Sequence, residues 1–99
     1  MANKYLDQLK DIVLAELRDE SVEILLFGSR ARGDGHAGSD VDIGLIPRRK
    51  LNPLKVSVLK EKIEESRVPY KVDIVNLSEV SKEFLDHALK RALTWKNWN

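Results

Sequence analysis

The sequence predicts an α/β (α+β) fold in which helices cover one small mixed β-sheet. Residues 22–27 form an almost wholly apolar run of strand-forming residues, which is typical of a buried strand. Residues 39–46 and 70–75 are two further strand-like runs, and three longer segments carry apolar residues at helical spacing. The expected order is therefore helix, strand, short helical turn, strand, helix, strand, helix, with the strand directions left open.

Capping residues place the helices. The first is expected over residues 3–19, with Asn3 as its N-cap. Asn52-Pro53 starts the next, because asparagine caps a helix and proline suits its first turn, and Val68-Pro69 ends it before the third strand. The last helix starts at Ser78 or Ser81 and runs to about Thr94. Its apolar residues are expected to cover the core: Val80, Phe84, Leu85, Ala88, Leu89, Ala92 and Leu93.

The length and composition suit one small domain. With 99 residues and 42% hydrophobic content, the chain has room for one core. We expect this domain over residues 1–94, followed by a tail over residues 95–99 that holds both tryptophans. These tryptophans either pack back on the domain or anchor a partner protein.

Charge and cysteine content exclude several classes of protein. The chain has 17 basic and 16 acidic residues, a net charge of +1, so we expect no direct binding to nucleic acid. The absence of cysteine excludes disulfides and cysteine zinc sites and fits a reducing compartment. No run approaches the ~18 apolar residues of a membrane span, and the charged residues 3–10 do not resemble a signal peptide. We therefore expect a cytoplasmic protein without membrane contact.

A glycine-serine turn follows the first strand. Gly28 allows a ligand to approach the backbone closely, and the N–H groups that open a following helix point at an anion. Gly28 and Ser29 are therefore candidate phosphate-binding residues. Arg30 and Arg32 are candidates for neutralising the phosphates, although arginines beside a loop are as often solvated. The glycine-rich residues 33–38, with His36, are expected to form a mobile loop.

Two spaced aspartates begin the second strand. Asp40 and Asp42 lie two residues apart, so on a strand both carboxylates project to one face while Val41, Ile43 and Leu45 project to the other. Adjacent carboxylates repel each other unless a cation lies between them, and such oxygen ligands suit Mg²⁺. The alternative is the solvated face of an ordinary strand.

One aspartate, Asp73, lies in the third strand among apolar neighbours. If this strand lies beside the second, Asp40, Asp42 and Asp73 converge opposite the glycine-serine turn. Three carboxylates in this arrangement suit two metal ions and an in-line displacement at phosphorus. Alone, such an aspartate more often marks an edge strand, but the three features together, in this order, predict nucleotidyl transfer.

These residues carry a resemblance to a known family. The pattern Gly28-Ser29-x-Ala31-Arg32-Gly33, then Ser39-Asp40-x-Asp42-Ile43, then Val72-Asp73-Ile74, resembles the DNA polymerase beta-type nucleotidyltransferase superfamily. Within it, the chain is most similar to the minimal nucleotidyltransferases, the MNT or MntA-like antitoxins that accompany a HEPN-domain toxin. The resemblance implies a mixed sheet, ATP as donor and Mg²⁺ as cofactor.

The resemblance also implies that AMP passes to a tyrosine of the HEPN-type partner. On this hypothesis Asp40 and Asp42 bind two Mg²⁺ ions, Asp73 binds the ion nearest the acceptor, and Ser29 holds the β and γ phosphates. Two alternatives remain: an antitoxin that neutralises its partner by binding alone, and transfer to a small molecule such as an aminoglycoside. The small size of the chain disfavours the latter, since a lone domain offers little wall for a sugar.

Overall fold

The computed structural model describes residues 3–32 and 40–98, and it confirms the predicted α/β fold. Four strands form one mixed sheet, in the order β3-β2-β1-β4. The elements in chain order are α1 (Lys4–Glu16), β1 (Val22–Phe27), α2 (Ser29–Arg32), β2 (Val41–Pro47), α3 (Pro53–Glu65), β3 (Val72–Asn76), α4 (Lys82–Leu89) and β4 (Leu93–Lys96).

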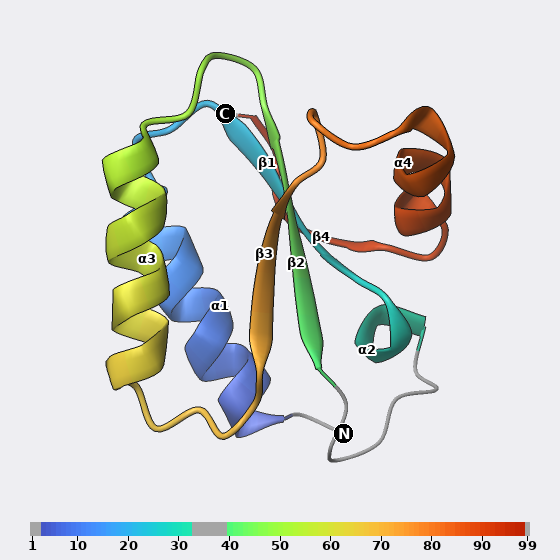
Figure 1. Ribbon diagram of the computed structural model, residues 1–99. Helices are drawn as coiled ribbons and strands as arrows, with labels where there is room; N and C mark the ends of the chain where they lie inside the picture. The colour runs from blue at the N-terminus through green and yellow to red at the C-terminus, as the bar shows by residue number, and fades with distance from the viewer. Residues whose placement is uncertain (1–2, 33–39, 99) are drawn as a thin grey trace.

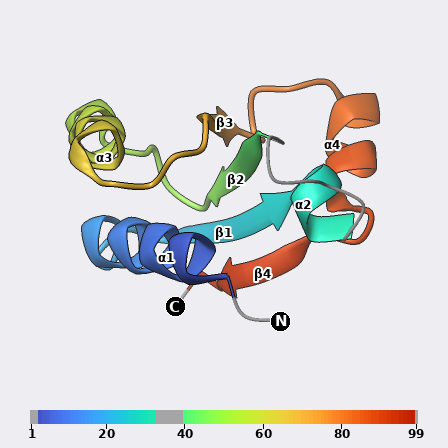
Figure 2. The same ribbon diagram turned by 90° about the horizontal axis from the view of Figure 1, so that it is seen from below.

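The helices lie on both faces of the sheet. Figure 1 shows α1 and α3 side by side on one face and α4 on the other, and Figure 2 shows the same layers from below. The short helix α2 follows β1 directly and lies at the end of the sheet on the α4 side. The sheet is therefore covered fully on one face and only in part on the other.

The pairing of the strands brings three chain segments to one end of the sheet. β1 is antiparallel to β2, with Phe27 opposite Asp42, and β2 is parallel to β3, with Asp42 opposite Asp73. The end of β1 therefore meets the starts of β2 and β3. The sequence left the strand directions open. These directions place the glycine-serine turn beside the aspartates.

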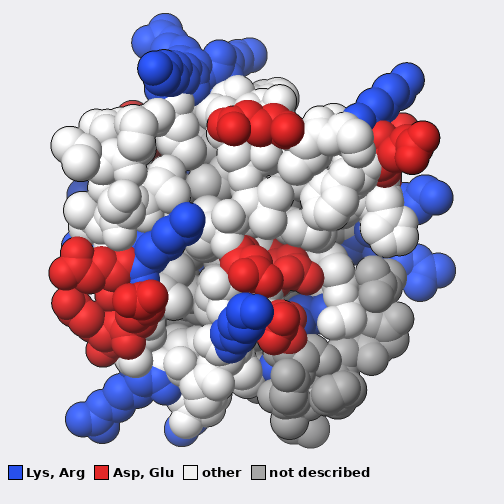
Figure 3. Space-filling view, in the orientation of Figure 1, with Lys and Arg blue, Asp and Glu red and all other residues white. Residues whose placement is uncertain are grey.

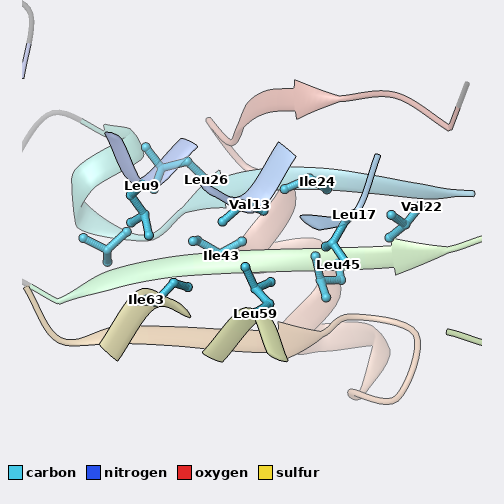
Figure 4. Packing of buried hydrophobic residues seen from close by; sticks show 11 residues of the cluster. Leu9, Val13, Leu17, Val22, Ile24, Leu26, Ile43, Leu45, Leu59 and Ile63 are labelled. Carbon is cyan, nitrogen blue, oxygen red and sulfur yellow. The ribbon is translucent and has the colours of Figure 1, made fainter. Parts of the chain in front are cut away.

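The main core lies between the sheet and the helices α1 and α3 (Figure 4). Alternate residues of β1 and β2 point into it, as the two-residue repeat of a strand requires. Each of the following is at most 8% exposed: Leu9, Val13, Leu17, Val22, Ile24, Leu26, Val41, Ile43, Leu45, Leu59 and Ile63. The prediction that Val41, Ile43 and Leu45 share the face away from Asp42 is confirmed.

A smaller cluster covers the other face of the sheet. It consists of Leu25, Phe27, Leu77 and Ala88, with Ala88 as its only buried residue from α4. Gly44 of β2 lies beneath this cluster, where an added Cβ would come within 2.5 Å of Leu77 Cδ1. This face is thus thinly covered near α4.

The predicted helix caps are confirmed. Asn3 Oδ1 accepts hydrogen bonds from the N–H groups of Tyr5 and Leu6, and Asn52 Oδ1 accepts one from that of Leu54. Of the two serines considered for the last helix, Ser81 is the cap, and its hydroxyl accepts a hydrogen bond from the N–H of Phe84 at 3.1 Å. Each cap satisfies a backbone donor that the helix leaves unpaired.

The last predicted helix is too long. α4 ends at Leu89, Arg91 takes a positive φ of 60°, and residues 93–96 form β4 against β1. The sequence contains no glycine or proline that would end the helix there. The physical reason for the strand is non-local: without it, the backbone groups along one side of β1 would lack partners.

The C-terminal tryptophans pack back on the domain, as one of the two predictions had it. Trp95 contacts the main core, and the indole N–H of Trp98 donates a hydrogen bond to the carbonyl of Ile46 at 2.7 Å. The boundary predicted after residue 94 falls within β4. In the chain segments that the structure describes, no helix is long and apolar enough to cross a membrane.

Candidate active site

Gly28 links the end of β1 to α2 and lies against the carboxylate of Asp42. Its φ of +77° belongs to the left-handed region, which glycine adopts without steric cost. A Cβ at this position would overlap Oδ2 of Asp42. Both the backbone conformation and the approach of the carboxylate therefore require glycine here. Ser29 begins α2 directly after it.

Asp42 and Asp73 are neighbours on two parallel strands. They are register partners at the starts of β2 and β3, and both are half-buried. Their chain neighbours Val41 and Val72 pack on the main core, so by strand alternation both aspartates face the α4 side. The strand register thus places Asp73 beside Asp42.

Asp40 lies just outside the second strand. β2 begins at Val41, whose N–H donates a hydrogen bond to the carbonyl of Lys71 at 2.9 Å, and Asp40 itself is exposed. The predicted strand began too early, so strand alternation does not fix the Asp40 side chain on the face of Asp42. Figure 3 shows acidic side chains gathered over the region of β2 and β3, with a basic side chain beside them.

The chemistry of these donors fits a magnesium ion. Carboxylate oxygens are the ligands that Mg²⁺ prefers, and it keeps several waters or substrate oxygens of its own. Across residues 3–32 and 40–98, no group of three or more His, Asp or Glu side chains lies close enough together to hold a metal. Asp42 and Asp73 are register partners, and Asp40 is an exposed third carboxylate two residues before Asp42.

The Arg30 guanidinium lies over an aromatic ring. It stands 4.1 Å from the centroid of Tyr70, which precedes β3. Tyr70 also meets Tyr5 edge-on, with centroids 5.9 Å apart, and its hydroxyl accepts a hydrogen bond from Asn3 Nδ2 at 3.0 Å. These contacts connect α2 to the start of α1 and to the segment before β3. Tyr70, which was predicted to lie in the third strand, instead lies before it.

Two of the other predicted features lie at the limit of what the structure describes. Arg32 is the last residue of α2, and its side chain is not described. The glycine-rich residues 33–38, including His36, lie outside the described residues. Asp73 pairs with Asp42 in the sheet, and Gly28, Ser29 and Asp42 lie together on the α4 side.

These three residues line one surface hollow with part of α4. The hollow has a volume of about 360 Å³ and is lined by Phe27, Gly28, Ser29, Asp42, Phe84, His87 and Ala88. Asp73 does not line it and borders a second hollow of about 260 Å³ beside α3. The Asp42–Asp73 pair thus stands between a space bounded by α4 and one bounded by α3.

The sequence interpretation missed Phe84 and His87. Phe84 was assigned to the buried stripe of the last helix, but it is 43% exposed, and Leu89 and Leu93 are 44% and 50% exposed. The spacing of Phe84 and His87 indicates one helical face, but it does not indicate which end of the sheet that face meets.

Comparison with known proteins places this geometry in a family. A sequence profile of the family described as "Polymerase beta, Nucleotidyltransferase" matches residues 7–95. The "Probable protein adenylyltransferase MntA" of Haemophilus influenzae is 36% identical over 58 residues, which is 59% of this chain and 51% of that protein. The chain thus spans about half the length of this curated relative.

Solved structures share the fold. A protein described as a minimal nucleotidyltransferase superposes with a TM-score of 0.72 at 24% identity, covering 94% of this chain and 95% of the other. A toxin-antitoxin crystal structure with AMP-PNP gives 0.69 at 24% identity, covering 89% and 73%. A complex of a tri-AMPylated Shewanella oneidensis HEPN toxin with its MNT antitoxin gives 0.64 at 20% identity, covering 92% and 71%.

Proposed function

The chain belongs to the polymerase beta nucleotidyltransferase family, and on that premise we propose that it transfers AMP from ATP to a hydroxyl group of a partner protein. The observation that carries the proposal is the junction of three strands at one end of the sheet. There, Asp42 faces Asp73 across a parallel pair, and Gly28 leaves room for the Asp42 carboxylate. A domain that needed only stability would gain nothing from this arrangement.

Each residue of the junction has a role in the proposed reaction. Ser29 and the backbone N–H groups of α2 would position the β and γ phosphates, while Asp40, Asp42 and Asp73 would hold Mg²⁺. When bound, Mg²⁺ neutralises phosphate charge and favours ionisation of the attacking hydroxyl. Asp73 accepts the proton of that hydroxyl, whose oxygen bonds to the α-phosphorus as the bond to the β-phosphate breaks and pyrophosphate leaves. Catalysis is mainly positioning and charge stabilisation.

The proposed acceptor is a tyrosine of a HEPN-type toxin, so that the chain acts as an antitoxin. The name of the Haemophilus relative supports a protein acceptor, and the AMPylated toxin in the Shewanella complex supports a HEPN toxin as that protein. We place the protein in the cytoplasm, where its proposed donor ATP is available.

The test is AMP transfer to the product of the neighbouring gene. The full chain, Mg²⁺, ATP labelled at the α-phosphate and that partner are incubated, and label on the partner is measured. Asp42→Asn should abolish labelling while leaving the complex with the partner intact on gel filtration. Asp19→Asn is the matched control, because Asp19 is exposed and precedes the start of β1, at the opposite end from Gly28. EDTA should abolish labelling by the wild-type chain.

The binding-only antitoxin is the second candidate. It is favoured by one observation, that no three metal-binding side chains are grouped in the described part of the chain. The two candidates differ in the Asp42→Asn variant. If this variant still neutralises the partner as fully as the wild-type chain does, neutralisation is by binding and the enzymatic proposal is wrong.

A further inference from the structure

The hollow beside Gly28 has two chemically different walls. One wall consists of the glycine-serine turn and the Asp42 carboxylate, which the proposed function assigns to phosphates and metal. The other wall belongs to α4 and presents Phe84, His87 and Ala88. These residues are spaced i, i+3 and i+4, so they lie on one face of the helix. The proposed reaction gives this second wall no role.

The exposure of Phe84 is unusually high for a large aromatic residue in so small a domain. It is 43% exposed, whereas Phe27, the other phenylalanine, is only 7% exposed. The helix is fixed at this point, because Ala88 is buried and the Phe84 N–H is bound by the Ser81 cap. The exposure of Phe84 is therefore set by the packing of α4, and it leaves an aromatic surface open at the hollow.

The orientation of the ring is also fixed. Phe84 meets Phe27 edge-to-face, with centroids 6.2 Å apart and an angle of 83° between the planes. In an edge-to-face pair, the edge of one ring covers one face of the other ring. At least one face of the Phe84 ring is therefore not covered by Phe27. Phe27 directly precedes Gly28 in the chain, so this aromatic pair adjoins the proposed phosphate site.

We propose that Phe84 stacks against the base of the nucleotide whose phosphates lie at Gly28 and Ser29, and that His87 contacts the same nucleoside. The inference rests on the proposed function and adds the means by which the chain itself holds the nucleoside. Aromatic rings stack on any base, because every base presents a π-face. The binding is therefore expected to depend on the presence of a base more than on its identity.

The test compares two ligands that differ in the nucleoside. Calorimetry on the full chain with Mg²⁺ measures the binding of two ligands. One is α,β-methylene-ATP, in which the bond to be broken is replaced, and the other is inorganic tripolyphosphate. Phe84→Leu keeps an apolar side chain but removes the π-face. It should weaken binding of the ATP analogue about tenfold, within the range observed for loss of one base stack, and leave tripolyphosphate unchanged. Phe84→Tyr should restore the affinity for the analogue.

Leu89→Ala is the matched control. Leu89 lies on the same helix and is 44% exposed, but it does not line the hollow, so its truncation should leave both affinities unchanged. Thermal unfolding of each variant verifies that α4 remains folded. The proposal is overturned if wild-type protein binds the analogue no more tightly than tripolyphosphate, if it binds neither, or if Phe84→Leu binds the analogue as wild type does.

The outcomes separate this inference from the proposed function. If Phe84→Leu keeps full affinity while the wild-type chain still labels its partner and Asp42→Asn does not, the stacking role alone is wrong. If the chain never transfers AMP but Phe84→Leu still loses affinity for the analogue, the nucleotide site stands and the proposed reaction fails.

Discussion

Gly28→Ala is the substitution that most directly tests the geometry of the site. The alanine must adopt a φ near +77°, and its Cβ must displace the Asp42 carboxylate. A left-handed conformation costs a non-glycine residue about 1–2 kcal/mol. The displaced carboxylate then leaves its place beside Asp73. A misplacement of about 1 Å in a catalytic group can cost about 100-fold in rate, so we expect at least that loss of AMP transfer.

Gly44→Ala is the matched control for this experiment. Gly44 lies on β2 two residues after Asp42. Its added Cβ meets Leu77 most closely and then Phe27, which lines the hollow but has no role in the proposed transfer of AMP. Overpacking should cost about 1–3 kcal/mol of unfolding free energy. Urea unfolding of each variant gives the fraction that is folded under the assay conditions, and the measured rate of AMP transfer is divided by that fraction. Gly28→Ala should then be inactive and Gly44→Ala should keep nearly full activity.

Two results would refute this reasoning. If folded Gly28→Ala transfers AMP at the wild-type rate, the position of the Asp42 carboxylate does not matter to the reaction. If Gly44→Ala loses activity as completely as Gly28→Ala after correction for folding, the loss reflects general disturbance of the sheet.

Three further predictions concern stability. Leu59→Ala should lower the unfolding free energy by about 2–5 kcal/mol in urea, because Leu59 is fully buried in the main core, and a loss well below this would contradict that packing. The hydrogen bond and charge of Glu16, 2.7 Å from Lys62, raise the pKa of Lys62 above 10.5. This stabilisation is present below about pH 10.5 and is lost as the pH rises through the raised pKa. Lys62→Gln should therefore flatten the alkaline fall in melting temperature. Asp73→Asn should raise the unfolding free energy by about 0.2–1 kcal/mol, because it removes a like charge beside Asp42, while abolishing AMP transfer. High salt should remove this gain in stability, and a loss of stability at low salt would contradict it.

Three of the four strands and the position of Asp42 within β2 were predictable from the sequence because local rules determine them. The apolar run of β1 and the alternation around Asp42 have the two-residue period of a strand, and the helix caps are local hydrogen bonds. The pairing of Asp42 with Asp73 was predicted on the condition that the two strands are neighbours. That condition is non-local, and the parallel register of β2 and β3 meets it.

The parts that the sequence did not predict depend on contacts between distant segments. Leu93 continues the helical spacing of α4, so its place in β4 follows only from the edge of β1 that it covers. The exposure of Phe84 follows from the angle at which α4 packs on the sheet. The spacing of apolar residues in the sequence does not predict this angle. The direction of the Asp40 side chain depends on where β2 starts. A shift of one or two residues in that start decides whether strand alternation applies to Asp40.

The residues of the site differ physically from those of the rest of the chain. The core follows the rules that maximise stability: apolar residues are buried and helix ends are capped. One end of the sheet departs from these rules. The like charges of Asp42 and Asp73 oppose each other on adjacent strands, and the left-handed backbone at Gly28 brings the end of β1 against Asp42. The opposed charges cost folding free energy, whereas Gly28 adopts its left-handed φ without steric cost, and both features lie where β1, β2 and β3 meet. A stability cost concentrated at one place is expected where a protein binds a ligand that compensates it, and a cation with a polyphosphate does so for paired carboxylates.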